Sequence, residues 1–166
     1  SPFYTNTLQV IRRMEKAGAK AFVLFNRMFE PDINLDTLQH STPFNLSTEG
    51  DYRLALRYAG VLYGNTKAAI CSSSGIYTGH DLAKMILAGA DAVQMVSALY
   101  KHKPELITNI LADLEKFMGK NGFDDIQAFK GKLSKAEVKD PYIYKRAQYI
   151  DLLLHSEQIF KKYPMV

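Results

Sequence analysis

What this chain of 166 residues lacks limits what it can be. It has a single cysteine, Cys71, which excludes an internal disulfide and favours a reducing compartment. No apolar run is long enough to span a bilayer. The N-terminus has neither the basic start nor the apolar stretch of a signal peptide. We therefore expect a cytoplasmic protein with no membrane partner.

The sequence also has little excess of positive over negative charge. The formal net charge is only +4, and the apolar content of 47% and charged content of 23% are ordinary for a globular protein. From Lys132 onward there are seven Lys or Arg against four Asp or Glu, spread along the tail rather than gathered with aromatic residues. This pattern is typical of a solvated face, so we expect no nucleic-acid partner.

Three helix-to-strand units follow one another along the first hundred residues. In each unit an amphipathic helix stops at or next to a glycine, and a short, almost wholly apolar run follows. The predicted helices are 7–16, 52–63 and 81–87, and the strands that follow them are 21–25, 67–71 and 92–96. Short apolar strands are typical of sheets buried on both faces, and the repeated order predicts a parallel α/β arrangement.

The other segments give weaker signals. An apolar stripe after Pro104 predicts a helix that ends at Gly119, and a short helix with a turn is expected over 123–133. A broad apolar pattern predicts a last helix over 143–160, which packs on something. The link 27–51 shows no periodicity, and a loop of that length in a compact domain usually carries function.

Small residues follow two neighbouring strands of the predicted sheet. Gly75 lets the backbone come close to a ligand, and the run 78–81 has the spacing of a capping box, so a helix should begin near Thr78. Ser97-Ala98 end the next strand in a similar way. Such residues can form a plain tight turn, but two stops on successive strands fit the phosphate site of a (β/α)8 barrel better.

Few side chains in this sequence are candidates for chemistry. Asn26 and Arg27 end the first strand, where they either bind a planar, anionic substrate or simply face water. Cys71 lies in an apolar strand and is expected to be a small core residue. The four histidines show no metal-ligand spacing, and no Ser/His/Asp or paired-carboxylate arrangement can be argued. We predict no metal site.

One long stretch resembles a known family. The segment SSSGIYTGHDLAKMILAGADAVQMVSAL is similar to the flavin-phosphate region of the dihydroorotate dehydrogenase (DHODH) family. The resemblance continues through KPELI, GF and GKL, while VLFNRMFEPDI and DPYIYKRAQYIDLLL are closest to a DHODH-like branch. It implies the C-terminal portion, about three βα units, of a TIM (β/α)8 barrel of the FMN-linked oxidoreductase type. Residues 1–133 would belong to the barrel and 134–166 to a helical tail packed on it.

The resemblance also implies a cofactor and site residues. FMN would be bound, and the activity would be oxidation of dihydroorotate to orotate in pyrimidine biosynthesis. The implied FMN-binding residues are Phe25 near the flavin ring, Ser47, and the backbone at Ser74, Gly75, Ser97 and Ala98. Asn26 and Arg27 would contact a small-molecule substrate. Arg27 stands where the family usually has Ser or Thr, and Ser74 where it usually has Gly.

The first half of the family's barrel has no counterpart in this sequence. The Cys or Ser base and the strand Lys that contacts the flavin are missing, so no catalytic residue is expected in this chain and it should be inactive alone. It opens with Ser1-Pro2 rather than Met, which fits a natural start and, at least as well, a piece cut from a longer protein. We expect association with its own copies or with a missing N-terminal half. Two alternatives are a phosphate-binding barrel enzyme without flavin and a non-catalytic barrel fragment that self-associates.

Overall fold

The structure is a computed structural model that describes residues 1–27, 30–144 and Leu154. At its centre lies a parallel three-stranded sheet in the order β1 (Ala21–Leu24), β4 (Ala69–Ser73) and β5 (Ala92–Gln94). In its register, Ala21 pairs with Ala69 and Cys71 with Ala92. Strands that neighbour in the sheet are joined through helices, so the predicted parallel α/β arrangement is confirmed.

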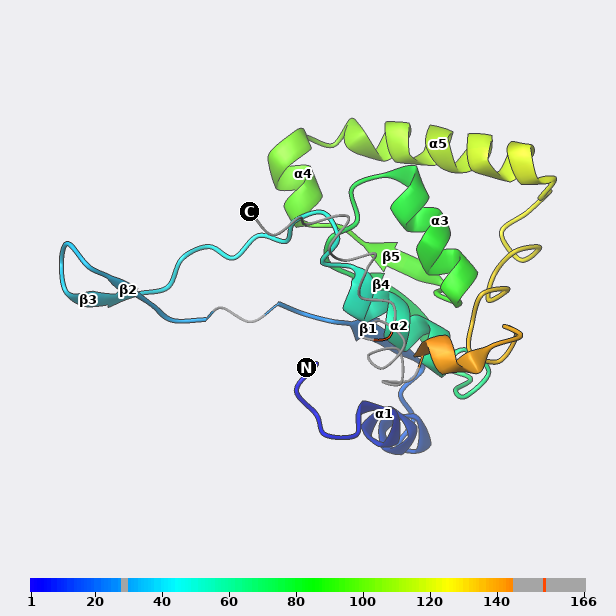
Figure 1. Ribbon diagram of the computed structural model, residues 1–166, viewed down its shortest axis with the longest axis horizontal. Helices are drawn as coiled ribbons and strands as arrows, with labels where there is room; N and C mark the ends of the chain where they lie inside the picture. The colour runs from blue at the N-terminus through cyan, green and yellow to red at the C-terminus, as the bar shows by residue number, and fades with distance from the viewer. Residues whose placement is uncertain (28–29, 145–153, 155–166) are drawn as a thin grey trace.

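Five helices accompany the described sheet: α1 (Thr7–Lys16), α2 (Arg53–Leu62), α3 (Gly79–Ala88), α4 (Ser97–His102) and α5 (Leu106–Asn121). Figure 1 shows α2 and α3 beside the sheet and the long α5 lying across α3. A 3-10 turn, Pro141–Tyr144, packs on α2. This is the layering of a βα-barrel segment, in which helices cover the outer face of a parallel sheet.

Alternation along β1 shows which face of the sheet is the core. Phe22 and Leu24 are buried against the helices together with Ile70 of β4. Val23 points the other way and is 52% exposed. The apolar strand runs predict a sheet buried on both faces, but the described residues cover only one. Burial of each large core side chain contributes about 1.5–3 kcal/mol.

Local caps set the helix boundaries that the sequence predicts best. The side chain of Asn6 accepts the Gln9 N–H at 3.0 Å and starts α1, whose bounds match the prediction. Thr78 and Asp81 form the complete capping box of α3. Gly89 ends α3 in the left-handed region, with φ 115°.

Other boundaries differ from the prediction. Strand β4 runs to Ser73, because the serines pair with β5 through Ser73 and Gln94 instead of forming a loop. Helix α5 passes through Gly119 and ends at Gly122, which takes the left-handed conformation with φ 68°. The short helix predicted over 123–133 is wrong, since these residues form turns.

The link 27–51, predicted to lack regular structure, contains a hairpin. Strands β2 (Asp32–Asn34) and β3 (Gln39–Ser41) pair antiparallel, and Figure 1 shows them projecting from the body of the molecule. The turn is held by the Asn34 side chain, which accepts the N–H of Asp36 at 2.9 Å and of Thr37 at 3.0 Å. Nearly all of the helix predicted over 143–160 lies outside the described residues. The division at residue 133 stays a prediction.

Candidate functional site

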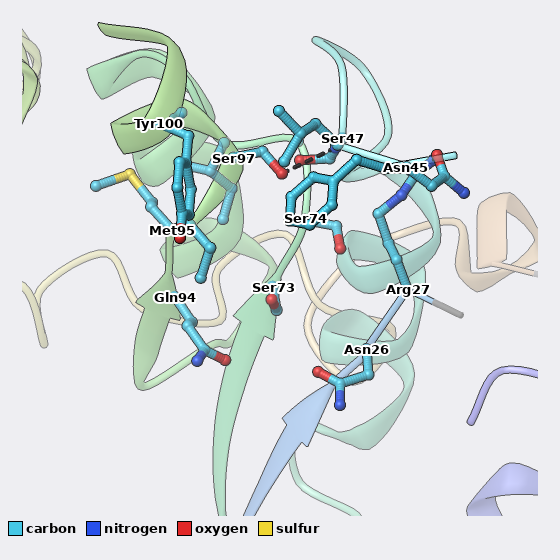
Figure 2. Close-up of a pocket in the computed structure, with 16 residues that line it drawn as sticks. Asn26, Arg27, Asn45, Ser47, Ser73, Ser74, Gln94, Met95, Ser97 and Tyr100 are labelled. Atoms are coloured by element: carbon cyan, nitrogen blue, oxygen red, sulfur yellow. Dashed lines mark hydrogen bonds between the residues drawn. The ribbon is translucent and has the colours of Figure 1, made fainter. Parts of the chain in front are cut away.

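A cavity of about 280 Å³ lies at the carboxyl ends of the three parallel strands. Its lining comes from all three strand ends, at 26–27, 73–76 and 94–98, and from 44–47 of the link before α2. Figure 2 shows these side chains gathered around one hollow. In parallel α/β folds ligands bind at this edge, because loops from neighbouring strands meet there.

The structure brings most of the predicted site residues to this cavity. Its lining includes the two substrate candidates, Asn26 and Arg27, and five of the six cofactor candidates: Ser47, Ser74, Gly75, Ser97 and Ala98. The sixth, Phe25, is buried and packs edge-on against Tyr58, with ring centroids 4.9 Å apart. It lines an adjacent cavity of about 260 Å³ instead. The roles of these residues stay predictions.

The turn after β4 has an unusual backbone. Ser74 and Gly75 both have positive φ, 80° and 70°. The Ser74 hydroxyl donates to the carbonyl of Phe25 at 3.3 Å, which ties this turn to the end of β1. A Cβ at Gly75 would lie 2.6 Å from the Tyr52 backbone nitrogen. Glycine is therefore required by the close packing of the turn on the start of α2, in addition to any approach to a ligand.

The first turn of α3 is engaged by its own side chains. The Asp81 carboxylate accepts the N–H of Tyr77 at 3.3 Å and of Thr78 at 3.1 Å, and the Thr78 hydroxyl accepts the Asp81 N–H at 3.1 Å. An acidic group already occupies the position that an anion would take at this helix start. An anion in the cavity would therefore contact the 74–76 turn rather than the N-terminus of α3.

Ser47 is fastened to two other parts of the site. Its N–H donates to the hydroxyl oxygen of Ser97 at 2.9 Å, as Figure 2 shows. Its carbonyl accepts the hydroxyl of Tyr77 and, at 3.0 Å, the ammonium of Lys101. These bonds hold the 44–47 link over the start of α4. Sequence reasoning missed Tyr77 and Lys101, because their partner lies far away along the chain.

The Arg27 side chain is already bonded to other residues of the protein. Its guanidinium pairs with the Asp51 carboxylate at 2.6 Å and donates to the side-chain oxygen of Asn45 at 2.6 Å. Burial would raise the pKa of Asp51, but hydrogen bonds from Thr48 and the charge of Arg27 outweigh it and hold that pKa below its usual value. Asp51 is thus ionised at neutral pH and offsets much of the positive charge of Arg27.

Polar side chains from three adjacent strands line the floor of the cavity. Asn26 follows β1, Ser73 ends β4 and Gln94 ends β5, opposite Ser73 in the register. Two carboxamides and a hydroxyl present both donors and acceptors to a flat polar ligand. Gln94 was overlooked, although it is the one polar residue of the predicted strand 92–96 and so carried a usable signal.

The other groups that could carry chemistry form neither a reactive thiol nor a metal site in the described residues. Cys71 is half-buried on β4, and burial raises the pKa of its thiol, which keeps it protonated and unreactive. Among residues 1–27, 30–144 and Leu154, no cluster of His, Cys, Asp and Glu has the arrangement of a metal site. In the same residues no helix has the length and apolar character to cross a membrane.

The fold and the cavity define a segment of a parallel βα-barrel with a small-molecule site at its strand ends. A family model described as dihydroorotate dehydrogenase matches residues 46–118. The chain is 32% identical to dihydroorotate dehydrogenase A (fumarate) of Lactiplantibacillus plantarum, over 77% of this chain and 43% of that protein. It is 39% identical to the enzyme of the same name from Lactococcus lactis, over 39% of this chain and 21% of that protein.

Solved structures share this fold. Ligand-free DHODH from Eimeria tenella superposes with a TM-score of 0.64 at 22% identity, over 79% of this chain and 38% of that one. The complex of that DHODH with ferulenol superposes equally well. The family model and these relatives support the dihydroorotate dehydrogenase family, as the sequence resemblance predicts, and the fold is an α/β portion of a TIM barrel. The chain spans less than half the length of the relatives that it matches.

Proposed function

We propose that this chain carries the FMN phosphate site of a DHODH-like oxidoreductase that converts dihydroorotate to orotate. One observation supports this above the others: the two small-residue turns singled out in the sequence line the same cavity, one after β4 and one after β5. In βα-barrels a phosphate commonly sits between the loops that follow the last two strands, beside a short extra helix. The six-residue α4 is such a helix.

The cavity fits one end of the cofactor. The backbone at Ser74 and Gly75 would face the phosphate from one side, and that at Ser97 and Ala98 from the other. No Asp or Glu is among the described residues that line the cavity, so the lining places no carboxylate against an anion. Its volume, about 280 Å³, lies at the lower limit for ligand pockets, which suits a phosphate and part of the attached chain.

The chain's own residues would bind and orient rather than transfer protons. FMN, when bound, supplies the hydride-accepting chemistry. Asn26, with its carboxamide at the floor of the cavity, would hold a flat polar substrate. Arg27 would fix the Asn45 link beside it and add a partly compensated positive charge toward an anionic substrate. The proton acceptor would come from a part of the protein outside this chain.

A pair of substitutions at Ser97 tests the phosphate site. Ser97→Asp places a negative charge beside the proposed phosphate, whereas Ser97→Asn is neutral and of the same shape. Both keep an oxygen that can accept the Ser47 N–H. We expect the Asp variant to bind FMN at least tenfold more weakly than the Asn variant, as charge repulsion of about 1.4 kcal/mol requires. Titration of the purified protein, followed by flavin fluorescence, measures this.

Riboflavin supplies the matched ligand control, because it is FMN without the phosphate. Its affinity should be the same for the Asp and the Asn variants, and well below that of FMN for the unmodified protein. Equal binding of riboflavin and FMN would contradict the phosphate site. A protein that binds inorganic phosphate but neither flavin would instead support a barrel enzyme without flavin.

A further inference from the structure

A separate cavity of about 440 Å³ opens on the helical side of the sheet. It lies between α2, α3 and the segment 133–144, and it shares no lining residue with the two cavities at the strand ends. Of the ten described residues that line it, seven are apolar or aromatic, and the other three are Arg53, Arg57 and Lys84. A mostly apolar wall with a few polar groups is the usual composition of a small-molecule pocket.

The apolar wall is built from fixed elements. Leu56 comes from α2, Leu87 from α3, and Leu133, which is 54% exposed, from the segment between α5 and the 3-10 turn. Tyr144 closes one end, where its ring rests on Gly60 so tightly that a Cβ there would lie 2.2 Å from it. The wall therefore has a defined shape and leaves apolar surface open at its rim.

The charged side chains that line this cavity in the described part of the chain are all positive. Arg53 and Arg57 are four residues apart on α2, so they project from the same face, and Lys84 lies opposite on α3. Among the described residues, no Asp or Glu lines the cavity. Within the described part of the chain the guanidinium of Arg53 makes no hydrogen bond or ion pair, whereas the backbone N–H of this residue donates to the Gly50 carbonyl at 3.2 Å. Arg57 uses only its Nε, which donates to the Tyr144 carbonyl at 3.3 Å.

Lys84 is the most restrained of the three cations. Its ammonium donates to the hydroxyl of Tyr52 at 2.8 Å and pairs with Asp81 at 3.2 Å. Its charge is partly offset, so the two arginines on α2 are the groups that remain available to an anion. A guanidinium offers paired donors that match a carboxylate or a phosphate.

We propose that this cavity binds a small anionic amphiphile, with its carboxylate or phosphate head on Arg53 and Arg57 and its apolar chain along Leu56, Leu87 and Leu133. The charge complementarity selects an anion, and the apolar wall selects a ligand with a hydrocarbon body. Both features are needed together, because a small hydrophilic anion would leave the apolar wall in water. The site is independent of flavin binding.

Calorimetric titration of the purified chain with four probes tests this site. Dodecanoate and dodecyl phosphate, used below their micellar concentrations, should bind, and the tighter of the two identifies the head group. Dodecanol, which lacks the charge, and butanoate, which lacks the apolar chain, should bind at least tenfold more weakly. Equal binding of dodecanol or of butanoate would overturn the proposal.

A double substitution locates the binding. Arg53→Gln with Arg57→Gln changes two exposed residues of α2 and should weaken dodecanoate binding by about 5- to 30-fold, the effect of losing 1–2 kcal/mol. Arg13→Gln, an exposed arginine of α1 away from the cavity, is the matched control and should leave binding unchanged. Circular dichroism confirms that both proteins keep their helix content. Unchanged binding in the double variant, or an equal loss in the control, would overturn the proposal.

Discussion

Ser47 and Ser97 are joined by a hydrogen bond of 2.9 Å, although 50 residues separate them in the sequence. The bond connects the link before α2 with the start of α4, which follows β5. The hydroxyl of Tyr77 and the ammonium of Lys101 meet the carbonyl of the same Ser47. The backbone N–H and carbonyl of Ser47 therefore hold together the loops on either side of the proposed phosphate site. Loss of these bonds should loosen the site, although none of the bonded groups is proposed to contact the ligand through its side chain.

Tyr77→Phe tests this tie. The variant removes only a buried hydroxyl, and the Ser47 carbonyl then accepts a hydrogen bond from Lys101 alone. We expect a loss of about 1 kcal/mol in the free energy of unfolding and a fall of about fivefold in FMN affinity, because the 44–47 link is less well positioned. Urea denaturation and flavin titration measure the two effects.

The control for Tyr77 is Tyr4→Phe, which removes the hydroxyl of a tyrosine that is 51% exposed. It should change neither the unfolding free energy nor the FMN affinity. If Tyr77→Phe lowers stability but leaves FMN affinity at the control value, the hydroxyl serves the fold alone and the link has no part in binding.

Gly75 and Gly18 form a matched pair for the turn after β4. Both have positive φ, 70° and 106°, so alanine is strained at either position by about 1–2 kcal/mol. Only at Gly75 would the new Cβ also meet neighbouring backbone, 2.6 Å from the Tyr52 nitrogen, whereas Gly18 has nothing within 4 Å. Gly75→Ala should therefore cost about 1–3 kcal/mol more than Gly18→Ala.

Urea denaturation of the two alanine variants measures this difference in unfolding free energy, and flavin titration measures their FMN affinities. Gly75→Ala should also weaken FMN binding, since displacement of the turn moves the Ser74 and Gly75 backbone. Gly18→Ala lies before β1, at the opposite edge of the sheet, and should leave FMN binding intact. Equal losses of stability would show that the packing of the turn on α2 is looser than the structure has it.

Helix starts and stops were predictable from the sequence because their causes are local. Asn6 caps α1 through a residue three positions along, and Thr78 with Asp81 does the same for α3. The end of α5 was misplaced, since Gly119 and Gly122 are equally good stops by residue type. Only the structure shows that Gly122 takes the left-handed conformation.

Features set by distant partners were not predictable. The extent of β4 depends on pairing with β5, so the serines after Cys71 looked like a loop. The β2–β3 hairpin has exposed residues on both faces of β2 and therefore no apolar alternation to reveal it. At the site, the glycine and serine turns were found by composition, whereas the bonds to Ser47 from Tyr77 and Lys101 cross 30 and 54 residues.

Ser72 presents the opposite case to Ser97. It lies on β4 with 0% exposure, and its hydroxyl makes no hydrogen bond with any residue that the structure describes. A buried hydroxyl without a partner costs free energy, so Ser72→Ala should leave the unfolding free energy unchanged or raise it by up to about 1 kcal/mol. Ser97→Ala, which removes the acceptor of the Ser47 N–H, should lower it by about 1 kcal/mol. Equal losses in the two urea unfolding curves would mean that Ser72 has a partner, such as a buried water.

The ion pair of Arg27 and Asp51 should make stability depend on pH in a defined direction. The pKa of Asp51 is lowered in the folded protein, so the unfolded chain binds more protons as the pH falls. The contribution is fully present above the usual carboxyl pKa of about 4 and is lost as the pH drops through the lower folded value. Both side chains are about one-third exposed, at 33% and 32%, which limits the contribution to about 1 kcal/mol or less.

Asp51→Asn should therefore lower the free energy of unfolding by about 0.5–1 kcal/mol at pH 7 and by progressively less from about pH 4 toward pH 3, because the carboxyl of the unfolded chain becomes protonated there before that of the folded chain. Urea denaturation at both pH values measures the gap between the variant and the unmodified chain. Asp36→Asn, at an exposed turn residue of the hairpin, is the control and should show no gap at either pH. A gap of the same size at pH 3 and pH 7 would mean that Asp51 acts through its shape rather than its charge. Arg27 would then carry an uncompensated charge toward the cavity, and its proposed role would change from holding the Asn45 link to binding the substrate anion directly.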